Sequence, residues 1–187
     1  MQSLNRSIGA LWITAVLAAC GGGESPADGS GLCPPTAAEG LDPGDVAPEL
    51  SLPDCGGTAR SLRDLCPRTA ALLYTFAATC TTCQAYAASG APNDLWQRYR
   101  DHDFAMWFIV TGDASNGPPD GSYCQVVAEQ YDLAMPVLFD AAGVTGEVLT
   151  MPGNSGELVL TEGNLIASKT WGAPGTVERV LEDLYGF

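Results

Sequence analysis

The chain of 187 residues is long enough for one domain of ordinary size with additional segments. Its 22 acidic against 8 basic residues give a formal net charge of −14, which repels phosphate backbones and argues against nucleic acid as a partner. Seven cysteines with a single histidine indicate an oxidising compartment and argue against a mixed zinc site.

Residues 1–19 have the pattern of a secretory signal peptide. Arg6 and the amino terminus form a basic start, and an apolar run from Ile8 to Ala19 follows. As a helix this run would be about 18 Å long, whereas a bilayer core needs about 30 Å. We therefore expect a signal for export and not a membrane span.

The stretch Leu17-Ala-Ala-Cys20 resembles the lipobox of bacterial lipoproteins. The resemblance implies that Cys20 is acylated and begins the mature chain, and that Gly21 after it favours the outer membrane. The alternative is an ordinary signal peptide with a cysteine near its cleavage site. Residues 20–44 then form a lipidated flexible tether, because Gly, Pro, Ser, Ala and acidic residues bury too little apolar surface to order the chain.

The first elements of the domain are a hairpin, a helical turn and a buried strand. Residues 46–60 are expected to form an edge hairpin that turns at Asp54-Cys-Gly-Gly57. Ser61 can cap a short turn over 62–65, which Pro67 terminates. The continuous apolar run 70–76 is typical of a central strand that is covered on both faces.

The remaining elements alternate between helix and strand, which predicts a parallel α/β core after the N-terminal hairpin. One domain over 45–187 accounts for the pattern. The expected elements are a helix from Cys80 to about Arg100, a strand over 104–110, a helix over 122–131, an extended piece over 136–140, a hairpin over 157–169 turning at 162–164, and a helix over 176–185.

Cys80 and Cys83 are the candidate catalytic residues. A cysteine at the start of a helix lies where unpaired amides and the helix dipole lower its pKa, so Cys80 is predicted to be the nucleophile. Cys83 lies one turn further on the same face and can resolve a mixed disulfide at Cys80. Half of a zinc site is the weaker interpretation, because no second Cys-x-x-Cys and no pair of histidines is present.

Residues 44–187 resemble the TlpA and ResA thioredoxins and their peroxiredoxin-like relatives. The resemblance rests on Gly44-Asp-Val-Ala-Pro48, the hairpin before Ser61, the strand that leads into Cys80-Thr-Thr-Cys83, Pro136-Val-Leu-Phe-Asp140 and a late hairpin containing Gly163. It implies an α/β thioredoxin fold, with a central mixed sheet flanked by helices and an N-terminal hairpin extension. It also implies a thiol:disulfide oxidoreductase without a cofactor, acting on protein thiols and disulfides of the cell envelope.

Members of that family hold the substrate against the cysteine pair with a loop containing a cis proline. The resemblance places this loop at Met151-Pro152, with Met135-Pro136 in reserve. The chain departs from the family at two positions. Thr79 stands where Trp usually precedes the first cysteine, and Tyr74 stands where many thioredoxins bury an acid.

These departures keep a second function open, a redox-silent binding or scaffold lipoprotein on the same fold. A third, a thiol peroxidase, rests on the shared fold alone, and the Pro-x-x-x-Thr-x-x-Cys pattern of peroxidases is absent around Cys80. The dipeptide Thr81-Thr82 does not decide between reductase and oxidase. We expect a monomer attached to the membrane through Cys20.

Four further cysteines form an even set that allows three disulfide pairings. We favour Cys55 with Cys66, because the hairpin could bring them together, and Cys33 with Cys124. The alternative makes Cys124 a third redox cysteine. His102, in Asp101-His-Asp103 between a helix and a strand, is predicted to be a solvated loop residue with no metal to bind.

Overall fold

The computed structural model describes residues 37–151, 153–172 and 175–186. The predicted signal peptide, the predicted acylation site Cys20, Cys33, most of the predicted tether and Pro152 lie outside these residues. Among the described residues, no helix has the length and apolar character that crossing a bilayer requires.

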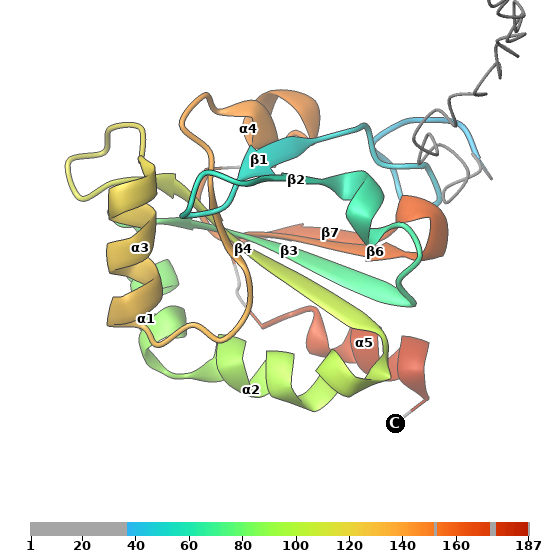
Figure 1. The fold of residues 1–187 in the computed structure, drawn as a ribbon. Coiled ribbons are helices and arrows are strands. Elements are labelled where there is room, and N and C mark those ends of the chain that lie inside the picture. The colour runs from blue at the N-terminus through green and yellow to red at the C-terminus, as the bar shows by residue number, and fades with distance from the viewer. Residues whose placement is uncertain (1–36, 152, 173–174, 187) are drawn as a thin grey trace, which may run out of the picture.

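A five-stranded mixed sheet forms the centre of the domain, in the order β5-β4-β3-β6-β7 (Figure 1). Strands β3, β4 and β5 run parallel, and β6 and β7 are antiparallel to their neighbours. All eight residues of β3 are buried, as its apolar run predicts. The strands are β3 (Ala70–Ala77), β4 (Phe104–Gly112), β5 (Val137–Phe139), β6 (Gly156–Thr161) and β7 (Leu165–Trp171).

Two layers of apolar side chains cover the sheet. One face packs against α1 (Thr81–Ala88), α2 (Ala91–Tyr99), α3 (Gly121–Gln130) and α5 (Glu178–Tyr185). The other face packs against the hairpin of β1 (Ser51–Pro53) and β2 (Ala59–Ser61), the 3₁₀ turn η2 (Leu62–Leu65) and the short helix α4 (Val144–Val148). Two further 3₁₀ turns, η3 (Arg100–His102) and η4 (Glu162–Asn164), precede β4 and β7 respectively.

The structure confirms most expected elements and corrects others. Ser61 caps η2 through a reciprocal capping box with Asp64, and η4 turns the last hairpin as predicted. The single helix expected from Cys80 to Arg100 is wrong, because the chain breaks at Gly90, whose φ of 78° lies in the left-handed region. Helix α4 has no counterpart among the expected elements.

Part of the predicted tether contacts the domain. The Val46 amide donates to the carbonyl of Ala38, and the Gly44 amide donates to the carbonyl of Ile166 in β7. The chain therefore already follows the edge of the sheet in the residues just before the predicted boundary at 45.

The pairing of the other cysteines differs from the one we favoured. Cys55 is bonded to Cys124, so the pairs Cys55–Cys66 and Cys33–Cys124 are both wrong. The amide of Cys55 donates to the carbonyl of Val137, which lays the hairpin turn along β5 and beside the first turn of α3. Cys66 is also disulfide-bonded, but not to Cys55.

This geometry explains why Cys124 serves a structural role. Its side chain is fully buried, and its partner Cys55 comes from the hairpin, whereas Cys80 is bonded to Cys83. Gly121 permits the close approach of α3, since a Cβ there would lie 2.9 Å from the Cys55 carbonyl oxygen. The disulfide fastens the hairpin to the α3 side of the sheet.

Removing this disulfide should lower stability substantially. The bond joins residues 69 apart in sequence, and the chain-entropy argument assigns about 4 kcal/mol to closing a loop of this length. We expect Cys55→Ala combined with Cys124→Ala to lower the free energy of unfolding by that amount, measured by urea denaturation of the oxidised protein. A loss below about 0.5 kcal/mol would contradict this account.

Candidate active site at the carboxyl end of β3

Cys80 lies at the junction between β3 and α1. It is the N-cap of α1, with extended backbone angles, and its sulfur accepts a hydrogen bond of 3.2 Å from the amide of Cys83. Its carbonyl accepts the amide of Gln84, the first backbone bond of the helix. Strand β3 therefore ends at the point where the free amides of a helix converge on a sulfur.

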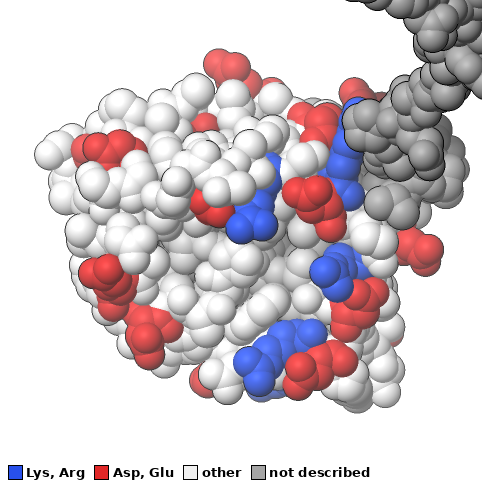
Figure 2. Space-filling view, in the orientation of Figure 1, with Lys and Arg blue, Asp and Glu red and all other residues white. Residues whose placement is uncertain are grey.

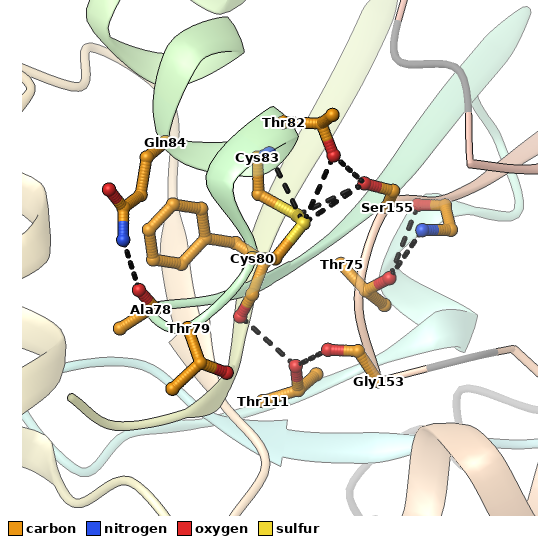
Figure 3. Close-up of a disulfide and its surroundings, with 12 residues drawn as sticks. Thr75, Ala78, Thr79, Cys80, Thr82, Cys83, Gln84, Thr111, Gly153 and Ser155 are labelled. Atoms are coloured by element: carbon orange, nitrogen blue, oxygen red, sulfur yellow. Dashed lines mark hydrogen bonds between the residues drawn. A yellow bond between two sulfur atoms is a disulfide. The ribbon is translucent and has the colours of Figure 1, made fainter. Parts of the chain in front are cut away.

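The two cysteines predicted to be catalytic are brought together in a disulfide (Figure 3). Cys80 is half-buried, whereas Cys83 is fully buried. Thr81 and Thr82 between them are exposed. A partner molecule arriving from solvent can therefore reach Cys80 before Cys83.

Ser155 is the third residue of the site, and sequence analysis missed it. Its hydroxyl lies 3.0 Å from the sulfur of Cys83 and 3.5 Å from that of Cys80 (Figure 3). The hydroxyl of Thr82 lies 3.2 Å from the Cys80 sulfur on the helix side. Because either oxygen can donate a hydrogen bond, both can stabilise a thiolate.

Strand β3 also holds Ser155 in place. The Ser155 amide donates to the carbonyl of Thr75, and its own carbonyl accepts the amide of Gly172. The buried Thr75 hydroxyl accepts the next amide, that of Gly156, at 2.7 Å. Ser155 has a φ of 52°, an uncommon conformation for a residue with a side chain, and these bonds fix it.

The predicted substrate loop is placed in part. Met151 is buried on the sheet face opposite α1, away from the sulfurs, and Pro152 lies outside the described residues. The second candidate, Met135-Pro136, leads into β5. No peptide bond between described residues is cis, so this pair does not form the expected cis-proline loop. Ser155, the last residue before β6, is the member of the loop that reaches the disulfide.

The hydrogen-bond contacts of the two sulfurs involve no charged group. Figure 2 shows the Lys and Arg side chains of one face gathered around η2 and the junction of α2 with η3, each beside an acidic side chain. The sulfurs of Cys80 and Cys83 instead contact the hydroxyls of Thr82 and Ser155 and the amide of Cys83. Stabilisation of a Cys80 thiolate would therefore come from the helix amides and neutral hydroxyls.

A buried acid lies on the neighbouring strand. Glu157 in β6 pairs across the sheet with Tyr74 and is only 1% exposed. Burial raises the pKa of Glu157, and hydrogen bonds from the Gly175 amide and the hydroxyls of Thr176 and Thr170 oppose that rise. Burial, followed by the negative charges of Tyr86 and Glu157, raises the pKa of Tyr74.

Tyr74 replaces the buried acid of many thioredoxins, but a buried acid, Glu157, lies directly opposite it on the adjoining strand β6. The sequence could have indicated Glu157, because it directly precedes the apolar run Leu158-Val-Leu160, and an acid in a strand that is covered on both faces is unusual. Ser155 gave no such signal, because it stands in a loop of Gly, Asn and Ser. Exposed His102 lies in η3, with its ring 6.0 Å from that of Tyr185.

No family model and no curated protein matches the chain. Solved structures do match. A thiol:disulfide interchange protein from Bacteroides sp. is 15% identical with a TM-score of 0.65, covering 79% of this chain and 92% of that one. The thioredoxin domain of a thiol-disulfide oxidoreductase from Bacteroides vulgatus is 16% identical with a TM-score of 0.62, covering 78% and 99%.

The peroxidoxin BcpB from Mycobacterium tuberculosis is similar to the same extent, at 18% identity and a TM-score of 0.63, covering 79% of this chain and 99% of that one. Together with the sheet order and the Cys80–Cys83 pair, these similarities establish the thioredoxin fold. Among the described residues, no group of three or more His, Cys, Asp or Glu side chains is placed to hold a metal ion.

The raised pKa of Glu157 predicts a specific dependence of stability on pH. The folded protein retains this proton above the ordinary value of 4.5, so it binds more protons than the unfolded chain between the two pKa values. Stability contributed by the protonated form is full below the unfolded value and declines as pH rises through that window. Glu157→Gln should remove this decline.

The measurement is the urea midpoint at a series of pH values between about 4 and 8. Glu182→Gln is the matched control, because Glu182 is an exposed acid on α5, and it should keep the slope of the parent protein. If the parent and Glu157→Gln proteins show the same slope, burial does not raise the pKa of Glu157.

Proposed function

We propose that the chain is a thiol:disulfide oxidoreductase that exchanges disulfides with protein partners through Cys80 and Cys83. One observation carries the proposal. A half-buried cysteine caps a helix that follows a central strand, and its sulfur is bonded to a fully buried cysteine one turn on. Redox exchange needs this division between an accessible and a protected sulfur.

In the reducing direction, the Cys80 thiolate attacks one sulfur of a partner disulfide. A bond forms between Cys80 and that sulfur, the partner disulfide breaks, and its second sulfur leaves as a thiolate. Cys83 loses its proton and attacks the Cys80 sulfur, which closes the intramolecular disulfide and releases the first partner sulfur. The dithiol loses two electrons, the partner gains them, and the two thiol protons balance the two partner thiolates.

Local contacts assist each half of this exchange. The Cys83 amide donates to the Cys80 sulfur, and the Thr82 hydroxyl lies beside that sulfur, so both favour a Cys80 thiolate. Ser155 lies nearest to Cys83 and can donate to its thiolate before the resolving attack. The reverse sequence oxidises a partner dithiol, and the reduction potential of the pair relative to the compartment sets the direction.

We further propose that the domain is exported and anchored to the membrane through acylated Cys20, with the outer membrane favoured and the domain facing the periplasm. The signal-like residues 1–19 and the lipobox-like Leu17-Ala-Ala-Cys20 support this location. The Cys55–Cys124 disulfide supports an oxidising compartment, since buried structural disulfides are rare in reduced cytosol.

Trapping tests the activity. In a Cys83→Ser protein, Cys80 can attack a partner disulfide but cannot be released, so a mixed disulfide with envelope proteins should accumulate and disappear on treatment with dithiothreitol. The matched control is Cys80→Ser with Cys83→Ser, which should trap nothing. Absence of any adduct across a range of redox buffers would favour the redox-silent scaffold over the oxidoreductase.

Acylation provides a separate test of location. The parent protein expressed with its own residues 1–19 should incorporate labelled palmitate and partition into the detergent phase of a Triton X-114 extract. Cys20→Ser should lose both properties while the Cys80–Cys83 exchange rate of the purified domain stays the same. A parent protein that is secreted without label would identify residues 1–19 as an ordinary signal peptide.

A further inference from the structure

An exposed tryptophan lies at the same end of the sheet as the disulfide. Trp171 ends β7 opposite Gly156, and the amide of the next residue, Gly172, donates to the carbonyl of Ser155. The Trp171 side chain is 49% exposed, and only Val126 and Leu184 are similarly exposed large apolar residues in the described part of the chain. Of these three, Trp171 lies nearest in the sheet to the residue that touches both sulfurs.

Trp171 forms one wall of a hollow on the sheet face opposite α1. The hollow has a volume of about 400 Å³, and Gly146, Thr150 and Met151 line the rest of it. Gly146 leaves space there, since a Cβ would lie 3.5 Å from the Met151 carbonyl oxygen. The floor and walls are mainly apolar, which suits an aliphatic or aromatic side chain.

A lysine contacts two of the residues that line the hollow. Lys169 is the only lysine in the sequence. Its ammonium group lies 5.4 Å from the Trp171 ring centre and donates a 3.0 Å hydrogen bond to the Thr150 hydroxyl. This contact orients the indole and places a positive charge at the rim of the hollow, in a chain whose net charge is −14.

The hollow and the disulfide are joined by one loop. Thr150 and Met151 line the hollow, and four residues later Ser155 contacts the sulfurs of Cys80 and Cys83. Four residues extend at most about 13 Å. An extended partner segment that crosses this loop can therefore reach both places with side chains no more than about four residues apart.

We propose that the hollow is a recognition subsite for an extended segment of the protein partner, which rests on the oxidoreductase function proposed above. The segment places an apolar side chain against Trp171 and Met151, within about four residues of its reacting cysteine. An acidic residue beside that side chain faces Lys169. Acidic and apolar sequences around the cysteine thus define the preferred substrate class.

The test uses the reduced protein and two symmetrical peptide disulfides. Each peptide carries a glutamate and, three residues from its cysteine, either leucine or serine. The second-order rate constant for thiol release should be about tenfold higher for the leucine peptide in the parent protein. Trp171→Ala should reduce that ratio to near one. Val126→Ala and Leu184→Ala, which remove the other exposed apolar side chains, should leave the ratio unchanged.

Lys169→Gln supplies the second readout. This substitution should lower the rate constant for the leucine peptide that carries glutamate more than that for an otherwise identical peptide that carries glutamine. Added salt should reduce the difference between the two rate constants in the parent protein. A parent protein that reacts with both peptides at the same rate overturns the subsite and leaves the oxidoreductase intact. A Trp171→Ala protein that loses rate equally on both peptides also overturns it. A parent protein that reacts with neither peptide overturns the proposed function as well.

Discussion

The contact between the first turn of α1 and the sulfur of Cys80 organises the site. Strand β3 is buried along its whole length, so its carboxyl end has a fixed position. Cys80 adopts extended angles there, and the Cys83 amide bonds its sulfur as the helix begins. The same turn places the sulfur of Cys83 within bonding distance of Cys80 and buries Cys83 on the side of α1 that packs against the sheet. The accessibility of one sulfur and the protection of the other therefore have a common origin.

The opposite side of the disulfide depends on the same strand. Thr75 in β3 holds both Ser155 and Gly156, through its carbonyl and its hydroxyl. Cys80 follows β3 in the chain, and Ser155 is hydrogen-bonded to Thr75 of the same strand. Any shift of β3 would move the two sides of the site together, which preserves the 3.0 Å contact between Ser155 and Cys83. A site supported in this way can stay geometrically constant while the disulfide opens and closes.

The sequence predicted features that depend on neighbours along the chain. The buried run of β3, the capping by Ser61 and the Cys-x-x-Cys spacing are local patterns, and the structure confirms the elements they indicate. The break at Gly90 was also local, but the amphipathic pattern continued across it and concealed a glycine at positive φ.

Features that depend on tertiary contacts could not be predicted. Cys55 meets Cys124 because the hairpin lies along β5, and nothing in the spacing of the cysteines specifies that path. Ser155 reaches the sulfurs only because β6 inserts beside β3, which brings together residues more than seventy positions apart. Glu157 is visible in the sequence as an acid at the start of an apolar strand, but its position opposite Tyr74 depends on the register of β6 against β3.

The two faces of the sheet divide the work of the site. Glu157 lies opposite Tyr74, which belongs to the apolar layer that α1 covers, and Ser155 contacts Cys83 in the same layer. Tyr74, Tyr86 and Glu157 also form a group of ionisable side chains on that face, where burial and, after it, the negative charge of Glu157 raise the pKa of both tyrosines. Trp171 and Met151 lie on the other face, where a partner can be recognised without disturbing the buried acid. Substitutions on the two faces should therefore separate partner preference from the ionisation of the reduced cysteine thiols, because the sheet itself lies between them.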